Sequence, residues 1–403
     1  MKTLVERRSG SIAALLSASV VLSLSAGPVL GDPAVVFPTE VISAPADPNP
    51  GGPGFDQVHF ARYMSLDEDR ALLVPSESSA AYIYRKGRDG WQYESRIALP
   101  ADHASATAAA LRGNVALVGS RSQQGTTSAL VFKRGPGGWA LIQTLPHGLN
   151  NTSGASIAAD RDTVAIGEND AVGIYQRTSS GLQLQARLSA PEVGRSFGSA
   201  LALEGQTLMV GSWQADNFHG AVYVYYRGST GWQLAQQLSA SDPQATFGYS
   251  LGFSGGIAVV GAYGADEDVN APVPTVKGAA YVFVKQGGSW HQQQKLLNPT
   301  NGTFSYAVAD TDGRRLFVGA FYIRAHDDDP LSSPTASKVF VYARRDGEWV
   351  TTRVLQPPAQ SNNFALSHSI DACVFLTSDA YVSTPDPLFD GEGYVYDLGD
   401  HCR

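Results

Sequence analysis

One short motif in the sequence has the form of a serine nucleophile. Residues 248–252 read G-Y-S-L-G and satisfy G-x-S-x-G. In hydrolases a strand, a sharp turn and a helix present the serine of this motif. Here the residues match residues 198–201 in an earlier copy of a repeated strand. We therefore interpret Ser250 as a repeat feature and expect no catalytic residue there.

The eight histidines offer no recognisable metal site. None of them forms H-x-x-x-H or H-E-x-x-H, the spacings that put two zinc ligands on one helix face. No G-x-x-x-x-G-K phosphate loop is present either. The sequence therefore predicts no catalytic residue and no cofactor. It favours a protein that is not an enzyme, while leaving catalysis open.

Three long acidic segments could carry chemistry instead, at about residues 263–277, 321–337 and 379–392. Segments of this length inside a compact domain are usually functional or disordered. Their carboxylates and aromatic rings suit a cation, a cationic ligand or a sugar. The candidate ligand-binding residues are Asp266, Glu267, Asp268, Tyr322, His326, Asp327, Asp328, Asp329, Tyr381 and Asp390.

Three functions are compatible with these segments. The first is a non-catalytic recognition module that binds a protein or glycan on the face with the long segments. The second is an exported carbohydrate-active hydrolase or lyase, in which two carboxylates at ~5–9.5 Å act as acid and base. The third is a structural or surface-assembly scaffold, in which the segments form only a solvated rim. A fold cannot choose among them.

The elements that would position these segments are short strands. Each repeat has four apolar runs rich in Val, Tyr, Phe and Ile and separated by glycine-containing turns, which is the pattern of a propeller blade. We therefore predict an all-β, seven-bladed β-propeller with four-stranded antiparallel blades. The repeats span about residues 55–100, 104–147, 154–190, 197–242, 247–298, 304–357 and 364–398.

The last repeat lacks a fourth strand because the chain ends soon after Tyr396. Residues 42–45 near the N-terminus resemble the fourth-strand residues 188–191, and Val36 takes the place of the usual tryptophan. We expect residues 36–44 to complete the last blade and close the ring, which leaves only short, protected edges. Pro38 fits an outermost strand, where a sheet tolerates proline.

The fifth repeat carries the clearest signature. It reads Phe-Gly-Tyr-Ser-Leu at 247–251, Val-Val-Gly-Ala at 259–262 and Gly-Ala-Ala-Tyr-Val-Phe at 278–283, followed by Trp290. This pattern resembles the FG-GAP repeat of integrin α chains and of many bacterial exported proteins. The resemblance implies a propeller with a recognition role for one face. The eroded copies of Phe-Gly are expected at residues 55–56, 104–105, 154–155 and 364–365.

The same family carries calcium loops of the form D-x-D-x-D-G-x-x-D in some blades. Only residues 310–313, which read Asp-Thr-Asp-Gly, resemble that loop. Arg314 and Arg315 follow where further oxygen ligands would come, although calcium needs six to eight oxygens. Asp310 and Asp312 are therefore weak metal candidates, and a tight hairpin turn is the favoured interpretation.

Charge and targeting features define the expected partners. A net charge of −8 without a basic stripe argues against nucleic acid. Residues 1–31 have a positive start, an apolar stretch at 12–24 and small residues after it, which is typical of a secretory signal peptide rather than a membrane span. We therefore expect a secreted, periplasmic or extracellular monomer without a membrane span.

Exported proteins fold in an oxidising environment, in which cysteines commonly form disulfides. Cys373 and Cys402 are the only pair in the chain, and both lie near its C-terminus. We predict a disulfide between them, which would tie the C-terminal end to a strand of the closing blade. A typical disulfide contributes ~2–4 kcal/mol.

Overall fold

The computed structural model describes residues 33–45, 60–77, 79–147, 156–168, 170–191, 196–242, 245–265, 278–297, 304–322, 337–357, 364–371, 373–379 and 391–399. The chain divides into two compact units, Met1–Pro33 and Ala34–Arg403. The second unit holds every described strand. The expected signal peptide lies outside the described residues. Among those residues, no helix is long and apolar enough to cross a membrane.

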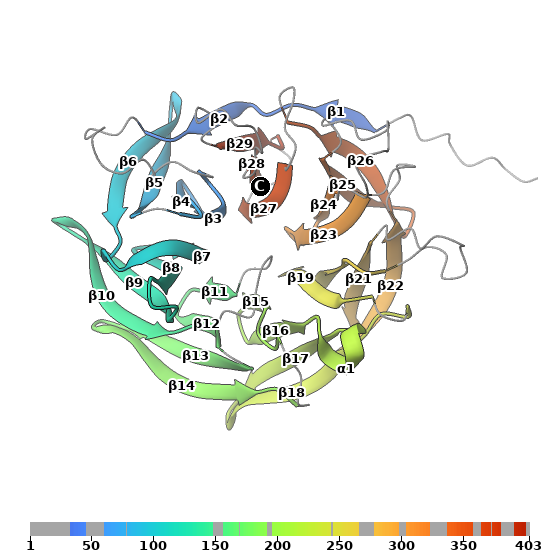
Figure 1. Ribbon diagram of the computed structural model, residues 1–403. Coiled ribbons are helices and arrows are strands. Elements are labelled where there is room, and N and C mark those ends of the chain that lie inside the picture. The colour runs from blue at the N-terminus through green and yellow to red at the C-terminus, as the bar shows by residue number, and fades with distance from the viewer. Residues whose placement is uncertain are drawn as a thin grey trace, which may run out of the picture. The chain divides into compact units, whose positions relative to one another are not determined.

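Seven sheets stand in a ring in the second unit, each with its first strand innermost (Figure 1). The predicted all-β seven-bladed propeller is thereby confirmed. The innermost strands of blades 1 to 7 are β3 (Tyr63–Asp67), β7 (His103–Arg112), β11 (Ile157–Asp160), β15 (Ala200–Glu204), β19 (Phe247–Ser254), β23 (Phe304–Thr311) and β27 (Phe364–Asp371). The second strands are β4 (Arg70–Val74), β8 (Val115–Ser122), β12 (Thr163–Glu168), β16 (Thr207–Ser212), β20 (Ile257–Ala262), β24 (Arg315–Tyr322) and β28 (Val374–Asp379).

The outer half of each blade follows the same order. The third strands are β5 (Ala80–Gly87), β9 (Thr127–Gly135), β13 (Ala171–Thr178), β17 (Ala221–Gly228), β21 (Ala279–Gln286), β25 (Lys338–Arg345) and β29 (Glu392–Asp397). The fourth strands are β6 (Gly90–Ala98), β10 (Gly138–Pro146), β14 (Gly181–Ser189), β18 (Gly231–Leu238), β22 (Ser289–Leu297), β26 (Glu348–Leu355) and, for blade 7, β2 (Glu40–Ser43). The helix α1 (Ala215–Phe218) is a single turn between β16 and β17.

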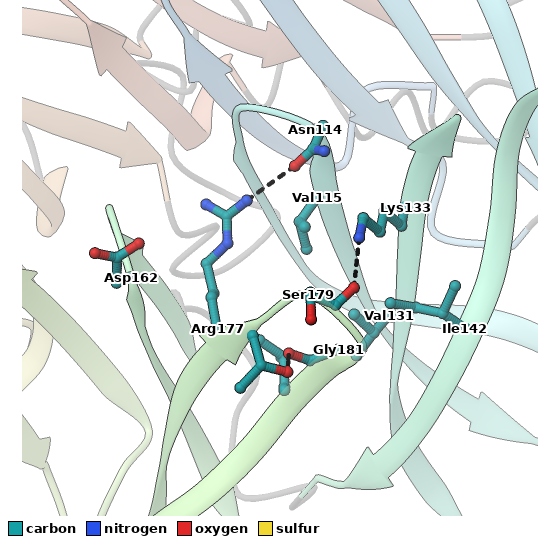
Figure 2. Close-up of a pocket in the computed structure, with 11 residues that line it drawn as sticks. Asn114, Val115, Val131, Lys133, Ile142, Asp162, Arg177, Ser179 and Gly181 are labelled. Atoms are coloured by element: carbon teal, nitrogen blue, oxygen red, sulfur yellow. Dashed lines mark hydrogen bonds between the residues drawn. The ribbon is translucent and has the colours of Figure 1, made fainter. Parts of the chain in front are cut away.

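The hydrophobic core lies between blades. All residues of β16 are buried, because each blade packs against a neighbour on both of its faces. One apolar cluster joins Met209 and Val222 of blade 4 to Phe247 and Tyr281 of blade 5. Between blades 2 and 3 the outer parts of the sheets diverge and leave a groove (Figure 2).

The N-terminal segment closes the ring, and it does so with two strands. β2 pairs antiparallel with β29, with Ile42 opposite Gly393, and so completes blade 7 as predicted. The expectation of one continuous strand from Val36 is wrong. β1 (Ala34–Val36) pairs parallel with β26 and becomes a fifth strand of blade 6. The chain changes partner around Pro38, which has no N–H to donate to either ladder.

Four blades begin with a phenylalanine that packs on the third strand of its own blade. The ring of Phe197 lies 5.6 Å from Tyr223 and 6.5 Å from Tyr225, measured between centroids. Phe60 makes matching contacts with Tyr82 and Tyr84 at 5.8 and 6.2 Å. Phe247 and Phe364 do the same in blades 5 and 7.

The Phe-Gly position of blade 1 is therefore occupied by Phe60-Ala61. The prediction that placed it at residues 55–56 is corrected accordingly. Residues 55 and 56 lie outside the described residues. Ala61 has a φ of 60°, and Gly198, which follows Phe197, has a φ of 87°. A left-handed conformation costs an alanine roughly 1–2 kcal/mol, so an alanine is not expected where the motif has glycine. For this reason the sequence pattern placed the motif five residues too early.

The predicted disulfide remains a prediction, because Cys402 lies outside the described residues. Cys373 stands in the turn between β27 and β28, and its carbonyl accepts a hydrogen bond from the N–H of Leu398 at 2.9 Å. This bond brings the end of blade 7 to Cys373. Only three residues separate Leu398 from Cys402 in the sequence.

Candidate functional site

Most of the predicted ligand-binding residues fall outside the described part of the chain. These are Asp266, Glu267, Asp268, His326, Asp327, Asp328, Asp329, Tyr381 and Asp390. Tyr322 is the last residue of β24. The strands that flank these segments end on one face of the ring, which we call the loop face. In blade 5, for example, Ala262 pairs with Ala279 at the end of the sheet opposite the turn that joins Ser254 to Ile257.

The opposite face, where the first strand of each blade turns into the second, we call the turn face. Each inner strand ends there, directly before a tight turn into the second strand. We call its last residue the rim position. The seven rim residues are Asp67, Arg112, Asp160, Glu204, Ser254, Thr311 and Asp371.

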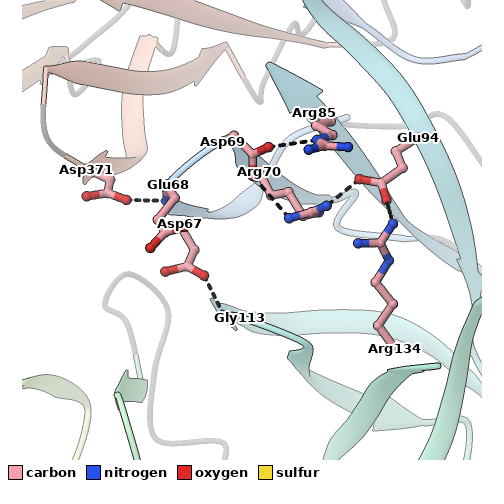
Figure 3. Close-up of polar contacts among 9 residues, drawn as sticks. All are labelled: Asp67, Glu68, Asp69, Arg70, Arg85, Glu94, Gly113, Arg134 and Asp371. Atoms are coloured by element: carbon pink, nitrogen blue, oxygen red, sulfur yellow. Dashed lines mark hydrogen bonds and ion pairs between the residues drawn. The ribbon is translucent and has the colours of Figure 1, made fainter. Parts of the chain in front are cut away.

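Each of the four rim carboxylates links its own blade to the next. Gly113 donates its backbone N–H to Asp67 at 2.5 Å, and Arg112 donates to the other oxygen of Asp67 at 2.7 Å. Asp371 accepts the N–H of Glu68 in the same manner (Figure 3). In both cases the donor directly follows the rim residue of the next blade. Hydrogen bonds to an ionised acceptor are about twice as strong as neutral ones, so these contacts stabilise the ring.

Two further blades repeat the arrangement. Asp160 accepts the N–H of Gly205 at 2.6 Å, and Glu204 accepts the N–H of Gly255 at 3.0 Å. Asp160 also lies 4.0 Å from the guanidinium of Arg112, and Glu204 also accepts from the hydroxyl of Ser254 at 3.4 Å. A carboxylate offers about four lone-pair positions, so two partners leave some of them available. The same acids can therefore hold the blades together and still attract a cation.

A second ionic network lies outside the rim and joins blades 1 and 2 (Figure 3). Glu94 on β6 accepts from Arg70 at 3.0 Å and also pairs with Arg134 on β9. Arg85 donates to Asp69 at 2.7 Å, and this hydrogen bond lowers the pKa of Asp69. These carboxylates already have arginine partners, so we assign them to blade packing.

The rim surrounds the mouth of the central channel. A cavity of about 480 Å³ opens there, and its wall carries more carboxyl groups than arginines. The charged lining residues are Arg112, Asp160, Glu204, Asp310, Asp312, Arg314 and Asp371. Arg112 is paired with Asp67 and also lies 4.0 Å from Asp160, so its charge is largely balanced within the rim. The mouth therefore favours cations over anions.

The two weak metal candidates have different roles. Asp312 accepts the backbone N–H of Arg315 at 2.6 Å and the guanidinium of the same residue at 2.7 Å. Asp310 points elsewhere and accepts the N–H of Thr311 at 2.8 Å. Among the described residues, no group of three or more His, Cys, Asp and Glu side chains converges as a metal site would require. Asp310 and Thr311 end β23, and residues 312–314 form the tight turn into β24, in agreement with the favoured interpretation of a hairpin.

Deeper in the channel, Asp310 meets a histidine from the next blade. Its Oδ2 lies 3.7 Å from Nε2 of His368, whose side chain is 4% exposed. Both residues line a cavity of about 220 Å³ enclosed by inner strands. The Nδ1 of His368 is buried and has no hydrogen-bond partner among the described residues.

Burial has opposite effects on the two groups, because it disfavours the charged form of each. It raises the pKa of Asp310 to about 7. The hydrogen bond from the N–H of Thr311 acts in the opposite direction and lowers this pKa, and the negative charge of Asp312 raises it further. It lowers the pKa of His368 to about 4. Between these values the pair is uncharged, with the proton on the carboxyl group.

Ser250 has a structural role. It lies on β19, is buried, and accepts the backbone N–H of Ala309 in blade 6 at 3.0 Å. No helix follows the motif, since β19 turns directly into β20. The interpretation of the serine motif as a repeat feature is therefore confirmed.

Sequence reasoning missed the rim, although a signal was present. The rim residue lies seven positions after the motif phenylalanine in blades 1, 4, 5 and 7, as with Phe197 and Glu204. An acidic residue at this position in blades 1, 4 and 7 could have been recognised in aligned repeats.

Comparisons with known proteins support the fold. Residues 232–283, from the fourth strand of blade 4 to the third strand of blade 5, match the FG-GAP repeat. No curated protein matches the chain. A chain in the crystal structure of the mitotic checkpoint complex is similar over 99% of both chains, with a TM-score of 0.57 and 10% identity. A putative 6-phosphogluconolactonase from Bacteroides uniformis is similar over 72% of this chain and 84% of its own, with a TM-score of 0.49 and 13% identity.

The repeat match and the similarity to the mitotic checkpoint chain agree with the blades described above, and at 10% identity the structural similarity concerns the fold alone. The chain is a seven-bladed β-propeller that carries the FG-GAP repeat.

Proposed function

We propose that this protein is a non-catalytic recognition propeller that binds a protein or peptide through a cationic side chain at the turn-face mouth of the channel. The carboxylates around the 480 Å³ cavity carry this proposal. Asp160, Glu204 and Asp371 each accept a backbone N–H there. Asp160 also lies 4.0 Å from Arg112 and Glu204 also accepts from the hydroxyl of Ser254, so lone pairs for a ligand remain mainly on Glu204 and Asp371.

The shape of the site supports a side chain rather than a free ion. The mouth adjoins the 220 Å³ cavity, with which it shares Leu203, Phe253 and Asp310. In that cavity the buried His368 keeps a nitrogen without a hydrogen-bond partner among the described residues. A lysine or arginine side chain would place its charge among the rim carboxylates. Its stem would lie against Leu203 and Phe253, which also line the mouth.

The acidic segments on the loop-face side remain a second place for a ligand within the same recognition role. Their candidate residues, from Asp266 to Asp390, lie outside the described part of the chain. Deletion of residues 263–277 tests them separately, because the mouth contains no residue of that segment.

Peptide binding tests the proposal at the mouth. Fluorescence anisotropy would compare labelled lysine-rich, arginine-rich and glutamate-rich peptides of equal length. We expect only the cationic peptides to bind, and more weakly at high salt. Glu204→Gln keeps an acceptor for Gly255 and should weaken binding about fivefold, since the loss of one exposed charge is worth ~1 kcal/mol. Glu348→Gln, the same change at an exposed residue outside the mouth cavity, is the control.

Two results would contradict the proposal. One is equal binding of the cationic and glutamate-rich peptides. The other is a loss of affinity in Glu348→Gln as large as that in Glu204→Gln.

One observation favours a second candidate, a hydrolase of saccharides. A carboxyl group with a pKa of about 7 can act as a general acid, and Asp310 shares its cavity with other carboxylates. Turnover of a polysaccharide panel that is lost in Asp310→Asn, with saccharide binding retained, would support this candidate over recognition alone.

A further inference from the structure

We propose a second binding site, for an organic carboxylate with an apolar body, in the groove between blades 2 and 3 (Figure 2). The groove has a volume of about 370 Å³ and opens on the turn face. Its walls come from β8, β9 and β10 on one side and from β13 and β14 on the other. It shares no lining residue with the mouth of the channel.

Two cations face this groove, one from each blade (Figure 2). Lys133 of blade 2 donates to the carbonyl of Ser179 at 2.8 Å. Arg177 of blade 3 donates to the carbonyl of Arg161 at 2.8 Å and to the side chain of Asn114 at 3.1 Å. Neither forms an ion pair with a carboxylate among the described residues.

These bonds orient the cations without using all their donors. Arg177 keeps its Nε–H and a second N–H on each terminal nitrogen, and Lys133 keeps further ammonium hydrogens. Burial lowers the pKa of Arg177 despite the attraction of Asp162 and Asp67, so the guanidinium is partly desolvated. A half-buried cation held in place by neutral acceptors gains more from an anionic ligand than a solvated one does.

The position is specific to blade 3. Arg227 occupies the equivalent place in blade 4, one residue before the end of the third strand, as Arg177 does in β13. Arg227 is exposed, and none of the described residues accepts a hydrogen bond from its side chain. What differs is the neighbouring blade, which supplies Asn114 and Lys133 to the groove beside Arg177.

The rest of the wall defines the body of the ligand. Ile142 lies in the groove beside the two cations and is 38% exposed, while Val115, Val131 and Leu182 form the buried apolar floor behind it. Exposed apolar surface next to oriented donors suits a ligand that is apolar at one end and anionic at the other. Asp162 also lies in the wall and opposes an anion, so its removal should strengthen binding.

Isothermal titration calorimetry with sodium benzoate tests the site, with benzamide as the neutral counterpart and sulfate as an anion without an apolar body. We expect saturable binding of benzoate alone. Arg177→Gln and Lys133→Gln should each weaken it at least tenfold, and Asp162→Asn should tighten it about threefold, as expected for one charge in a half-buried site. Arg227→Gln, the matched control, should leave it unchanged.

Other results would overturn the site. Benzamide binding as tight as benzoate would remove the role of the charge, and sulfate binding as tight as benzoate would remove the role of the apolar wall. A loss in Arg227→Gln equal to that in Arg177→Gln would mean that binding is not located in the groove. Melting temperatures of the variants identify any loss of folding. The peptide affinity of the mouth should not change in Arg177→Gln.

Discussion

The rim carboxylates should contribute to stability as links between blades, and Asp67 offers the sharpest test. Its side chain is 9% exposed and accepts from Gly113 of the next blade and from Arg112. Asp67→Ala removes both bonds and leaves the N–H of Gly113 without an acceptor. Asp67→Asn restores a neutral acceptor but not the charge.

The magnitude follows from the partners. A hydrogen bond to a charged group contributes about 1.5–3 kcal/mol, and the pair with the 39% exposed Arg112 adds up to ~1 kcal/mol after solvent screening. We expect Asp67→Ala to lower the free energy of unfolding by about 2–4 kcal/mol and Asp67→Asn by roughly half of that. With ~2.1 cal/mol/K of unfolding entropy per residue, a loss of 3 kcal/mol lowers Tm by about 4 °C for a domain of this length.

Urea titration followed by tryptophan fluorescence measures the free energy, and calorimetry measures Tm. Asp89→Ala is the matched control, because Asp89 is exposed in a turn of the same blade and makes no side-chain hydrogen bond with the described residues. If Asp67→Ala costs no more than Asp89→Ala, or if Asp67→Asn costs as much as Asp67→Ala, the rim carboxylates are not charge-assisted links.

Three further predictions follow from the same structure. Burial raises the pKa of Asp310 from 3.8 to about 7, so between these values the folded state holds a proton that the unfolded state has released, and stability falls as pH rises through this range. The free energy of unfolding of Asp310→Asn, minus that of the unsubstituted protein, should therefore be about 1–4 kcal/mol larger at pH 8 than at pH 4, as measured by urea titration. If this difference does not depend on pH, the assignment is refuted. Deletion up to the end of β1 should lower Tm by only a few degrees, because a short parallel edge strand is lost, whereas deletion through β2 opens blade 7 and should abolish cooperative unfolding, as shown by calorimetry. Cys373→Ser should destabilise the oxidised protein by about 2–4 kcal/mol and have no effect under reducing conditions if the disulfide with Cys402 forms; equal losses under both conditions would exclude it.

The repeat itself could be read from the sequence because its signals are local. Alternating apolar residues and turn glycines predict each strand without knowledge of its neighbours, and the missing fourth strand of blade 7 pointed to Ile42 and the residues around it. The parallel pairing of β1 with β26 could not be predicted in this way. It depends on where the chain lies after it leaves blade 7, and Val36 is apolar enough for either blade.

The first repeat shows the limit of a motif. Phe55 and Phe60 both fit an eroded Phe-Gly pattern, and the ring contacts of Phe60 with Tyr82 and Tyr84 are what distinguish it. The local sequence could not distinguish Phe60 from Phe55, because Ala61 adopts a backbone conformation that is normally occupied by glycine.

The sequence by itself determined the number of blades, the strand order and the absence of a nucleophile elbow at Ser250, since all of these rest on residues close together in the chain. The tertiary structure alone decided which charges meet. Asp310 and His368 are 58 positions apart, yet they lie 3.7 Å apart because the inner strands of consecutive blades are neighbours around the channel. The rim carboxylates and the groove of Lys133 and Arg177 arise in the same way, from residues that the packing of neighbouring blades brings together.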